Sequence, residues 1–383
     1  MKNKESDFMN LGIYIHIPFC VRKCNYCDFL SFPACSAECI SDYLNALISE
    51  IELWKETVSA YEVDTIFIGG GTPSLLSERE LGKLFDSLYK NLDLSCLQEF
   101  SMECNPGTVT DEKLRLCHEA GVNRLSFGMQ STIEKELKKL GRIHTYDEFV
   151  QGYEWARRVG FSNINVDLMA AIPEQTLSSY EESLRKVCAL SPEHISSYSL
   201  IIEEGTPFYT LYGKNPPVDE DTDREMYELT SDLLEQHGYE RYEISNYARK
   251  GKECKHNLKY WKRSEYIGIG LGASSFLNEK RFSNERELSA YTDKIRMKII
   301  PVAEEEIVSR EEAMAEFMYL GLRCIEGISE REFQQQFSCG LMEFYGKTIH
   351  RFLKEELLVQ RGERIALTKR GIDVSNRVFS EFL

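Results

Sequence analysis

Short apolar runs alternate with amphipathic segments along the first half of the chain. Six apolar runs, each of strand length, are separated by six segments whose apolar residues recur at helical spacing. The predicted strands span 11–17, 63–69, 99–103, 124–128, 163–168 and 194–200, and the predicted helices span 37–59, 77–92, 110–120, 132–140, 146–159 and 177–190. This alternation is typical of βαβ units and a parallel sheet. It predicts an α/β fold, either a partial or closed (β/α) barrel or an open doubly wound sheet.

The alternation of strands and helices ends after Gly205-Thr-Pro207, and the whole chain is predicted to have three parts. Residues 1–215 form the barrel, 216–300 an irregular α/β extension, and 301–383 a largely helical domain. Near the end, two short strands around Arg361-Gly362-Glu363 follow three helical segments, which predicts a C-terminal α+β, winged-helix-like domain. Winged helices often bind DNA, but acidic residues alternate with the basic ones here, which favours packing or docking of a partner.

Composition and charge exclude several classes of function. The 383 residues include 46 Lys and Arg against 62 Asp and Glu, a net charge of −16 that argues against binding nucleic acid or anionic membranes. No run of about 18 apolar residues is present, and the first residues lack the apolar core of a secretory signal. Twelve cysteines without such a signal indicate reduced thiols, so we expect a cytoplasmic protein.

Three cysteines directly follow the first predicted strand, with Cys-x3-Cys-x2-Cys spacing at Cys20, Cys24 and Cys27. Three thiolates aimed at one point suit zinc or an iron–sulfur cluster far better than calcium or magnesium. Structural zinc sites normally have a fourth Cys or His close by, whereas Asp28 and Phe29 follow here. The spacing therefore favours a four-iron cluster with one open iron over a zinc site, and over buried thiols without a metal.

Glycine and polar residues follow the other predicted strands, at the edge where ligands gather in both architectures. The run 69–73 follows the second strand, Glu103 the third and Gln130 the fourth, while Asp167 ends the fifth. The glycines allow a ligand to approach the backbone, or form a tight turn, and match no phosphate-binding loop. Arg142 can pair with a carboxylate and Asp167 can accept from ribose hydroxyls. Alone, each polar residue has an alternative role as a capping or surface group; together they predict one binding site.

The segment Tyr14-Ile-His-Ile-Pro-Phe-Cys20, with Cys24, Cys27 and Gly69-Gly-Gly-Thr-Pro73, resembles the radical S-adenosylmethionine (SAM) superfamily, in the branch of oxygen-independent coproporphyrinogen oxidases. That resemblance implies a partial (β/α)6 TIM-like barrel and a [4Fe-4S] cluster whose fourth iron is chelated by SAM. In the superfamily, one electron from the cluster cleaves SAM to methionine and a 5′-deoxyadenosyl radical, so an electron donor is implied. It assigns the cluster to the three cysteines, and SAM to Tyr14, Tyr26, Gly70, Gly71, Thr72, Glu103, Gln130, Arg142 and Asp167.

A second motif, His256-Asn257-Leu-Lys-Tyr260-Trp261, is similar to the His-Asn-x-x-Tyr-Trp motif of HemW-type haem chaperones. Asp28 also fits that branch, because the oxidases carry one more cysteine directly after the cluster motif. The imidazole offers an axial ligand and the two aromatic rings offer faces to a macrocycle, whereas packing is the alternative role of the histidine. The resemblance implies a haem chaperone that binds haem at this motif and hands it to an acceptor haem protein, for example a membrane-associated respiratory one.

Two other functions remain open on the sequence. The SAM site also fits a radical SAM oxidase of the coproporphyrinogen III dehydrogenase type or another tetrapyrrole-modifying enzyme, so enzymatic activity is left open and no catalytic residue is assigned. A zinc-stabilised interaction protein is the third class. No nucleic-acid partner is expected, and a homodimer is allowed.

Overall fold

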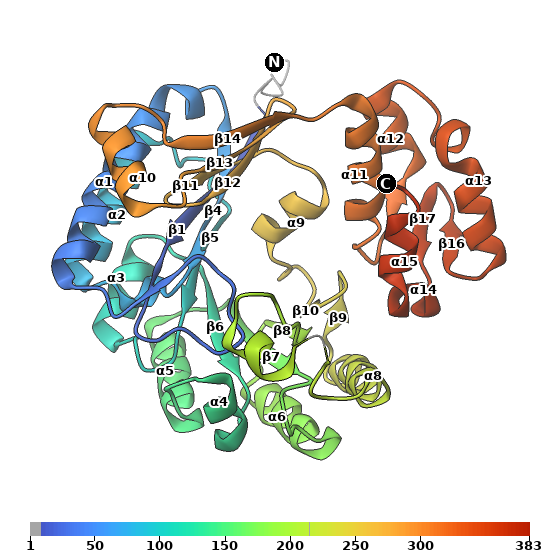
Figure 1. Ribbon diagram of the computed structural model, residues 1–383, viewed down its shortest axis with the longest axis horizontal. Helices are drawn as coiled ribbons and strands as arrows, with labels where there is room; N and C mark the ends of the chain where they lie inside the picture. Colours follow the sequence, from blue (N-terminus) through green and yellow to red (C-terminus); the bar gives the residue numbers. More distant parts are fainter. Residues whose placement is uncertain (1–8, 214) are drawn as a thin grey trace.

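A computed structural model describes residues 9–213 and 215–383. The prediction that the first residues lack a secretory signal concerns residues 1–8, which lie outside the described residues. Six parallel strands form the centre of a twelve-stranded sheet (Figure 1). They are β1 (Asn10–Ile17), β4 (Glu62–Gly70), β5 (Glu99–Cys104), β6 (Arg124–Gln130), β7 (Ile164–Ala170) and β8 (His194–Ser199). They neighbour one another in chain order, as in a barrel and not in a doubly wound sheet. Since β1 does not pair with β8, the barrel is partial, as predicted.

The predicted helices lie between these strands and cover the outer face of the sheet (Figure 1). They are α1 (Ala37–Val58), α2 (Glu78–Asn91), α3 (Asp111–Glu119), α4 (Glu134–Leu140), α5 (Tyr146–Val159) and α6 (Leu177–Leu190). Local signals set their ends: Ser77 and Glu80 form a capping box before α2, and Gly141 and Gly160 end α4 and α5 in left-handed conformation. Their apolar faces and the strands share one core, so every strand end is held at a fixed position.

Both edges of the sheet are extended by strands from later in the chain. At one edge β11 (Tyr266–Ile269) pairs parallel with β1 and continues antiparallel into β12 (Ser274–Leu277), β13 (Lys280–Asn284) and β14 (Val302–Ile307). At the other edge, β10 (Asn246–Ala248) and β9 (Glu240–Arg241) continue from β8. Three helices connect these strands: α8 (Glu220–Gln236), α9 (Lys255–Trp261) and α10 (Leu288–Arg296). Most of residues 216–300, predicted to be irregular, therefore form regular helices and strands that belong to the barrel sheet. The boundaries of the three predicted domains are still a prediction.

The C-terminal part has the element order helix, strand, two helices and two strands. It contains α11 (Arg310–Gly321), β15 (Ile328–Ser329), α12 (Glu330–Phe337), α13 (Leu341–Lys354), β16 (Leu358–Arg361) and β17 (Arg364–Leu367), followed by α14 (Lys369–Asp373) and α15 (Ser375–Ser380). The three strands form a separate antiparallel sheet over their own apolar core, which is a winged-helix-like arrangement. Within the described residues, no helix combines the length and the apolar character needed to cross a membrane.

Candidate cofactor cleft at the carboxyl ends of the strands

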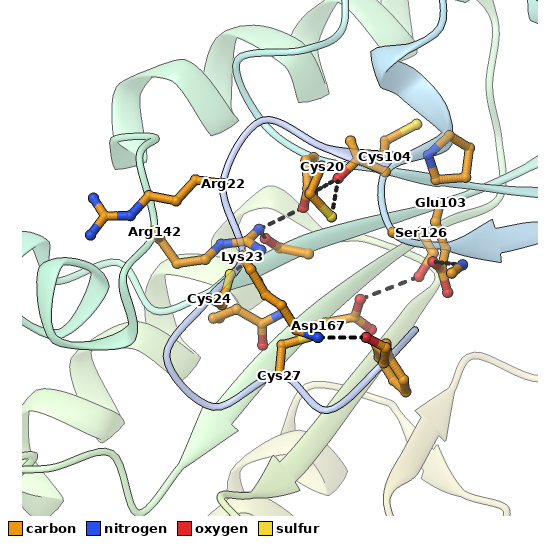
Figure 2. A pocket seen from close by; sticks show the side chains of 18 of the residues that line it. Cys20, Arg22, Lys23, Cys24, Cys27, Glu103, Cys104, Ser126, Arg142 and Asp167 are labelled. Atoms are coloured by element: carbon orange, nitrogen blue, oxygen red, sulfur yellow. Dashed lines mark hydrogen bonds between the residues drawn. The ribbon is translucent and has the colours of Figure 1, made fainter. Parts of the chain in front are cut away.

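Cys20, Cys24 and Cys27 line one cleft at the carboxyl ends of the barrel strands, here called the cluster cleft (Figure 2). The loop that carries them leaves β1 through the short strand β2 (Phe19–Cys20) and returns through β3 (Phe32–Pro33). Eight of the nine residues predicted to bind SAM line the same cleft: Tyr26, Gly70, Gly71, Thr72, Glu103, Gln130, Arg142 and Asp167. The ninth, Tyr14, lines a neighbouring cavity instead. The fold thus brings together residues that the sequence spreads over almost 150 positions.

The cysteine loop is fastened to the barrel by Asn25. Its side-chain amide donates to the carbonyl of Lys139 at 2.8 Å, and its backbone N–H donates to the carbonyl of Leu140 at 2.9 Å. Its own carbonyl accepts from the backbone N–H of Phe208, at the start of α7 (Pro207–Tyr212). A Cβ on Gly141 would lie 3.1 Å from the Asn25 side chain, so glycine allows this close approach. The loop that carries the three thiols is therefore held in place at the cleft.

The thiols face positively polarised groups. Arg142 donates from Nη1 to Cys24 Sγ at 3.6 Å, and the Thr72 hydroxyl donates to Cys20 Sγ at the same distance. Burial raises the pKa of Cys20, and it raises the pKa of Cys27 to about 11, so metal binding has to displace protons from these thiols. Among the described residues, no three His, Cys, Asp or Glu side chains converge closely enough to hold a single ion. Three thiols distributed around a cleft fit a larger group, a four-iron cluster bound at three corners.

The glycine run after β4 brings the cysteine loop and the strand ends into contact. Gly70 has φ of +111°, and a Cβ there would lie 2.5 Å from the ring of His16. A Cβ on Gly71 would lie 2.7 Å from the carbonyl oxygen of Phe19. A side chain at Gly70 would therefore displace His16 of β1, and one at Gly71 would displace the start of the cysteine loop. The Gly70 backbone N–H donates to Oε2 of Glu103 at 3.0 Å, which joins the run to the carboxylate at the end of β5.

Two half-buried carboxyl groups, those of Glu103 and Asp167, line the same cleft as the thiols (Figure 2). Burial, and secondarily the charge of Asp167, raises the pKa of Glu103 to about 8. Burial also raises the pKa of Asp167, although Asn165 donates to it at 2.7 Å and Ser126 at 3.4 Å. A cationic ligand group would stabilise the ionised forms of both.

Arg142 is partly committed within the cleft and partly free. Its Nη2 donates to Oδ1 of Asn105 at 2.7 Å and also to the carbonyl of Gly128. Its Nε is buried and has no hydrogen-bond partner among the described residues. A buried donor without a partner costs free energy, so this atom is suited to the carboxylate of a ligand. The predicted bidentate pair would require Arg142 to release one of its present partners.

Asn105 and Ser126 are among the cleft residues that sequence reasoning did not assign. Asn105 donates from Nδ2 to the Thr72 hydroxyl at 2.6 Å and accepts from Arg142, so it connects the glycine run to the arginine. Its position two residues after Glu103, at the end of a predicted strand, could have revealed it.

Gln130 reaches the cleft because β6 ends in a bulge. There this residue has φ of +70°, a strained conformation for any residue other than glycine.

The His-Asn-x-x-Tyr-Trp motif forms helix α9 and is packed against the barrel. Glu99 receives the first N–H groups of α9, from Lys255 at 2.8 Å and His256 at 3.2 Å, and so acts as the helix cap. The His256 side chain is 0% exposed, with Nδ1 2.9 Å from the Thr65 hydroxyl and Nε2 2.9 Å from the Tyr260 hydroxyl. Burial, followed by the charge of Lys259, lowers the pKa of His256 to about 3.

As folded, His256 therefore has no nitrogen available to a haem iron. In this structure His256 has the alternative role given above, packing within the barrel. The predicted axial ligation would require His256 to break two hydrogen bonds and to leave its stacked position on Phe67. Tyr260 and Trp261 line the same neighbouring cavity as Tyr14, whereas Asn257 does not. The motif thus divides into a buried histidine and two aromatic residues at a cavity wall.

Family models and known proteins match this chain. Residues 14–187 match the Radical SAM superfamily, and residues 308–374 match the HemN C-terminal domain. Heme chaperone HemW of Bacillus subtilis is 40% identical over 97% of this chain and 98% of its own length. The Lactococcus lactis heme chaperone HemW is 36% identical over 97% of this chain and 96% of its own. The solved structure of coproporphyrinogen III oxidase (HemN) from Escherichia coli has a TM-score of 0.85, at 21% identity, and covers 99% of this chain and 91% of that one.

Proposed function

Because this chain belongs to the HemW family of heme chaperones, within the radical SAM superfamily, we propose that it binds haem and a SAM-liganded [4Fe-4S] cluster and delivers the haem to an acceptor haem protein. The observation that carries the proposal is the 40% identity to a heme chaperone over 97% of the chain, which includes the cleft and helix α9. The family expected from the cysteine, glycine and histidine motifs is confirmed.

The residues of the cluster cleft support the cofactor part of the proposal. Cys20, Cys24 and Cys27 would hold three irons, and the cluster would supply an electron to SAM. Glu103 and the backbone of the glycine run would hold the SAM amino group, and Arg142 Nε its carboxylate. Asp167, Asn165 and Ser126 form a polar group suited to ribose hydroxyls. Tyr26 would lie against the cluster, with its hydroxyl kept neutral because burial raises its pKa.

A haemin titration tests this function. Purified protein with its cluster reconstituted anaerobically is titrated with haemin, and then mixed with an apo haem protein. We expect a saturable change of the Soret band, followed by transfer of the haem at a rate above that of free haemin. Absence of saturable binding would contradict the proposal.

The second candidate, a radical SAM oxidase acting on a tetrapyrrole, is favoured by the eight predicted SAM-binding residues that line the cleft. It is tested by anaerobic incubation with a reductant, SAM and coproporphyrinogen. Decarboxylated product together with 5′-deoxyadenosine would support the oxidase, whereas SAM that stays intact in the presence of coproporphyrinogen would support the chaperone.

We further propose a cytoplasmic location, a reduced protein as electron donor, and a membrane-associated respiratory haem protein as acceptor. The net charge of −16 supports a protein partner over a nucleic acid. Haem transfer to membranes that contain the apo acceptor, compared with membranes lacking it, tests the acceptor. Light scattering of the haem-free and haem-loaded protein tests whether a homodimer forms.

A further inference from the structure

A cavity of about 570 Å³ lies next to the cluster cleft, between the cysteine loop, the β11–β13 edge of the sheet and helix α11. Small-molecule sites typically measure roughly 300–1,000 Å³, so its size fits a large cofactor. Phe29 lines both spaces, which places the cavity directly beyond the cysteine loop. We call it the aromatic–arginine cavity after the residues that form its walls. Nothing in the cluster chemistry described above uses it.

One wall of the cavity is aromatic. Tyr260 and Trp261 come from the end of α9, and Tyr266 begins β11. The rings of Tyr260 and Tyr266 are in edge-to-face contact, with centroids 4.7 Å apart. Phe276 lies on the adjacent strand β12 and also faces the cavity. A wall of this width offers stacking and edge contacts to a flat aromatic ligand.

Arginine side chains gather at the cavity, although the chain is strongly acidic overall. Arg263, Arg281 and Arg286 line it, against a single acidic residue, Asp28. Arg263 and Arg281 share the carboxylate of Glu316, each at 2.8 Å, and Arg263 also pairs with Glu279, whereas the Arg281 side chain remains 40% exposed. Arg286 is exposed and forms no ion pair with any described residue. These arginines are suited to the carboxylates of an anionic ligand.

Both histidines near the cavity are engaged in hydrogen bonds. His16 lies with Nδ1 3.0 Å from the Tyr14 hydroxyl and Nε2 2.8 Å from the Leu30 carbonyl, and His256 is held as described above. Among the cavity tyrosines, the hydroxyls of Tyr14 and Tyr260 are taken by these two histidines. The hydroxyl of Tyr266 has no hydrogen-bond partner among the described residues. Among the cavity tyrosines, it is therefore the one whose oxygen an iron entering the cavity would find open.

From these three features we infer that the aromatic–arginine cavity seats the haem, with its carboxylates toward Arg281 and Arg286 and the Tyr266 oxygen as the ligand of ferric iron. Ligation breaks the phenol O–H bond and forms the Fe–O bond, the proton leaves to solvent, and the iron stays ferric. His256 is then a positioning residue, which holds Tyr260 in the wall through its Nε2. The inference rests on the proposed haem-binding function and gives that function a place and a ligand.

The test is haemin titration of the cluster-loaded full chain carrying single substitutions. Arg286→Glu should raise the Kd for haemin by about tenfold, the scale of one lost charge-assisted contact. The control Arg79→Glu makes the same change of charge at an exposed position on α2 and should leave the Kd unchanged. Because Arg286 is exposed, its substitution should not disturb folding, which near-ultraviolet circular dichroism verifies.

The ferric absorption spectrum tests the ligand. Tyr266→Phe should abolish the phenolate-to-iron charge-transfer band, whereas Tyr89→Phe, on the far surface of α2, should retain it. His256→Gln should weaken haemin binding but keep the wild-type band. Equal Kd values for Arg286→Glu and Arg79→Glu would overturn the inference, as would a spectrum changed by His256→Gln and not by Tyr266→Phe. Wild-type protein without saturable binding would instead overturn the proposed function itself.

Discussion

The cluster cleft and the aromatic–arginine cavity are adjacent but are built in opposite ways. The cleft is small, about 130 Å³, and takes its residues from loops that follow consecutive parallel strands. The cavity is about 570 Å³ and joins residues from the first strand, the cysteine loop, α9, the β11–β13 edge and α11. In the cleft, most polar side-chain groups contact one another or a thiol, and Arg142 Nε is the exception. In the cavity, the exposed Arg286 forms no ion pair and the Tyr266 hydroxyl no hydrogen bond with the described residues.

The difference indicates two kinds of ligand site. A cleft whose side chains are fixed by buried hydrogen bonds holds a small group in one orientation, as a resident cofactor requires. A wider, more open cavity with exposed arginines suits a ligand that must also leave, because exposed ion pairs contribute little free energy. The proposed chaperone needs one site of each kind, the cleft for a resident cofactor and the cavity for a haem that is bound and released.

The largest effect is expected from Cys24→Ser, which breaks the cleft and spares the cavity. Loss of one of three thiolates should abolish the brown absorbance of the anaerobically reconstituted cluster, because hydroxyl is a poor ligand for these irons. The protein should still bind haemin, since the cavity walls do not include Cys24. Absorption and iron content measure the first result, and haemin titration the second.

Cys96→Ser is the matched control, because Cys96 is exposed and distant from the cleft loops. It should leave the iron content unchanged. An unchanged cluster spectrum in Cys24→Ser would mean that other thiols hold the metal, and the distinction between cleft and cavity would lose its chemical basis.

A second, smaller effect is expected from Glu99→Ala, which should break the cavity and spare the cleft. Glu99 accepts the first N–H groups of α9 and a hydroxyl hydrogen bond from Ser101, and lies near the buried Arg124. Removal of a buried carboxylate that balances a buried charge costs about 3–5 kcal/mol of unfolding free energy. Urea unfolding should show this loss relative to Glu78→Ala on the surface of α2.

In the same variant, haemin affinity should fall while the cluster content stays near wild type, because α9 carries two cavity residues and no cleft residue. A parallel loss of cluster and haem would show that the two sites are one cooperative unit.

The barrel and the cleft could be predicted largely from sequence, because both follow local rules. Apolar periodicity located all six strands of the barrel, and the carboxyl ends of such strands meet at one edge, so Glu103 and Asp167 could be placed together. The cavity could not be predicted in this way. Its walls depend on β11 pairing parallel with β1 across most of the chain, which no local pattern encodes. For the same reason His256 was expected at a ligand, although tertiary packing against Thr65 and Phe67 buries it.

A third effect, of about 3 kcal/mol between pH 5 and pH 8, concerns the pH dependence of the cleft. The pKa of Glu103 is raised from 4.5 to about 8, so the folded chain retains a proton that the unfolded chain loses. The stability that this proton contributes is fully present below pH 4.5 and is lost as the pH rises to about 8. In the cluster-free protein, Glu103→Gln should therefore be more stable relative to wild type at pH 8 than at pH 5. Urea unfolding at both values measures the difference, and a difference independent of pH would contradict it.

The smallest expected effect tests the boundary between the two sites at Phe29. This side chain lines both spaces and is 64% exposed, so Phe29→Ala should change the unfolding free energy little. It removes one apolar contact from a ligand in the cavity and opens the wall toward the cleft. We expect haemin affinity to fall about threefold, the scale of a partly buried aromatic contact.

With the wall present, SAM should also change the affinity for haemin, because each ligand orders the Phe29 side chain. In Phe29→Ala the affinities for SAM and haemin should become independent of each other. Val21→Ala, an exposed apolar residue on the other side of the cysteine loop, is the control. If SAM still changed haemin affinity equally in both variants, Phe29 would not be the contact through which the cleft and the cavity communicate.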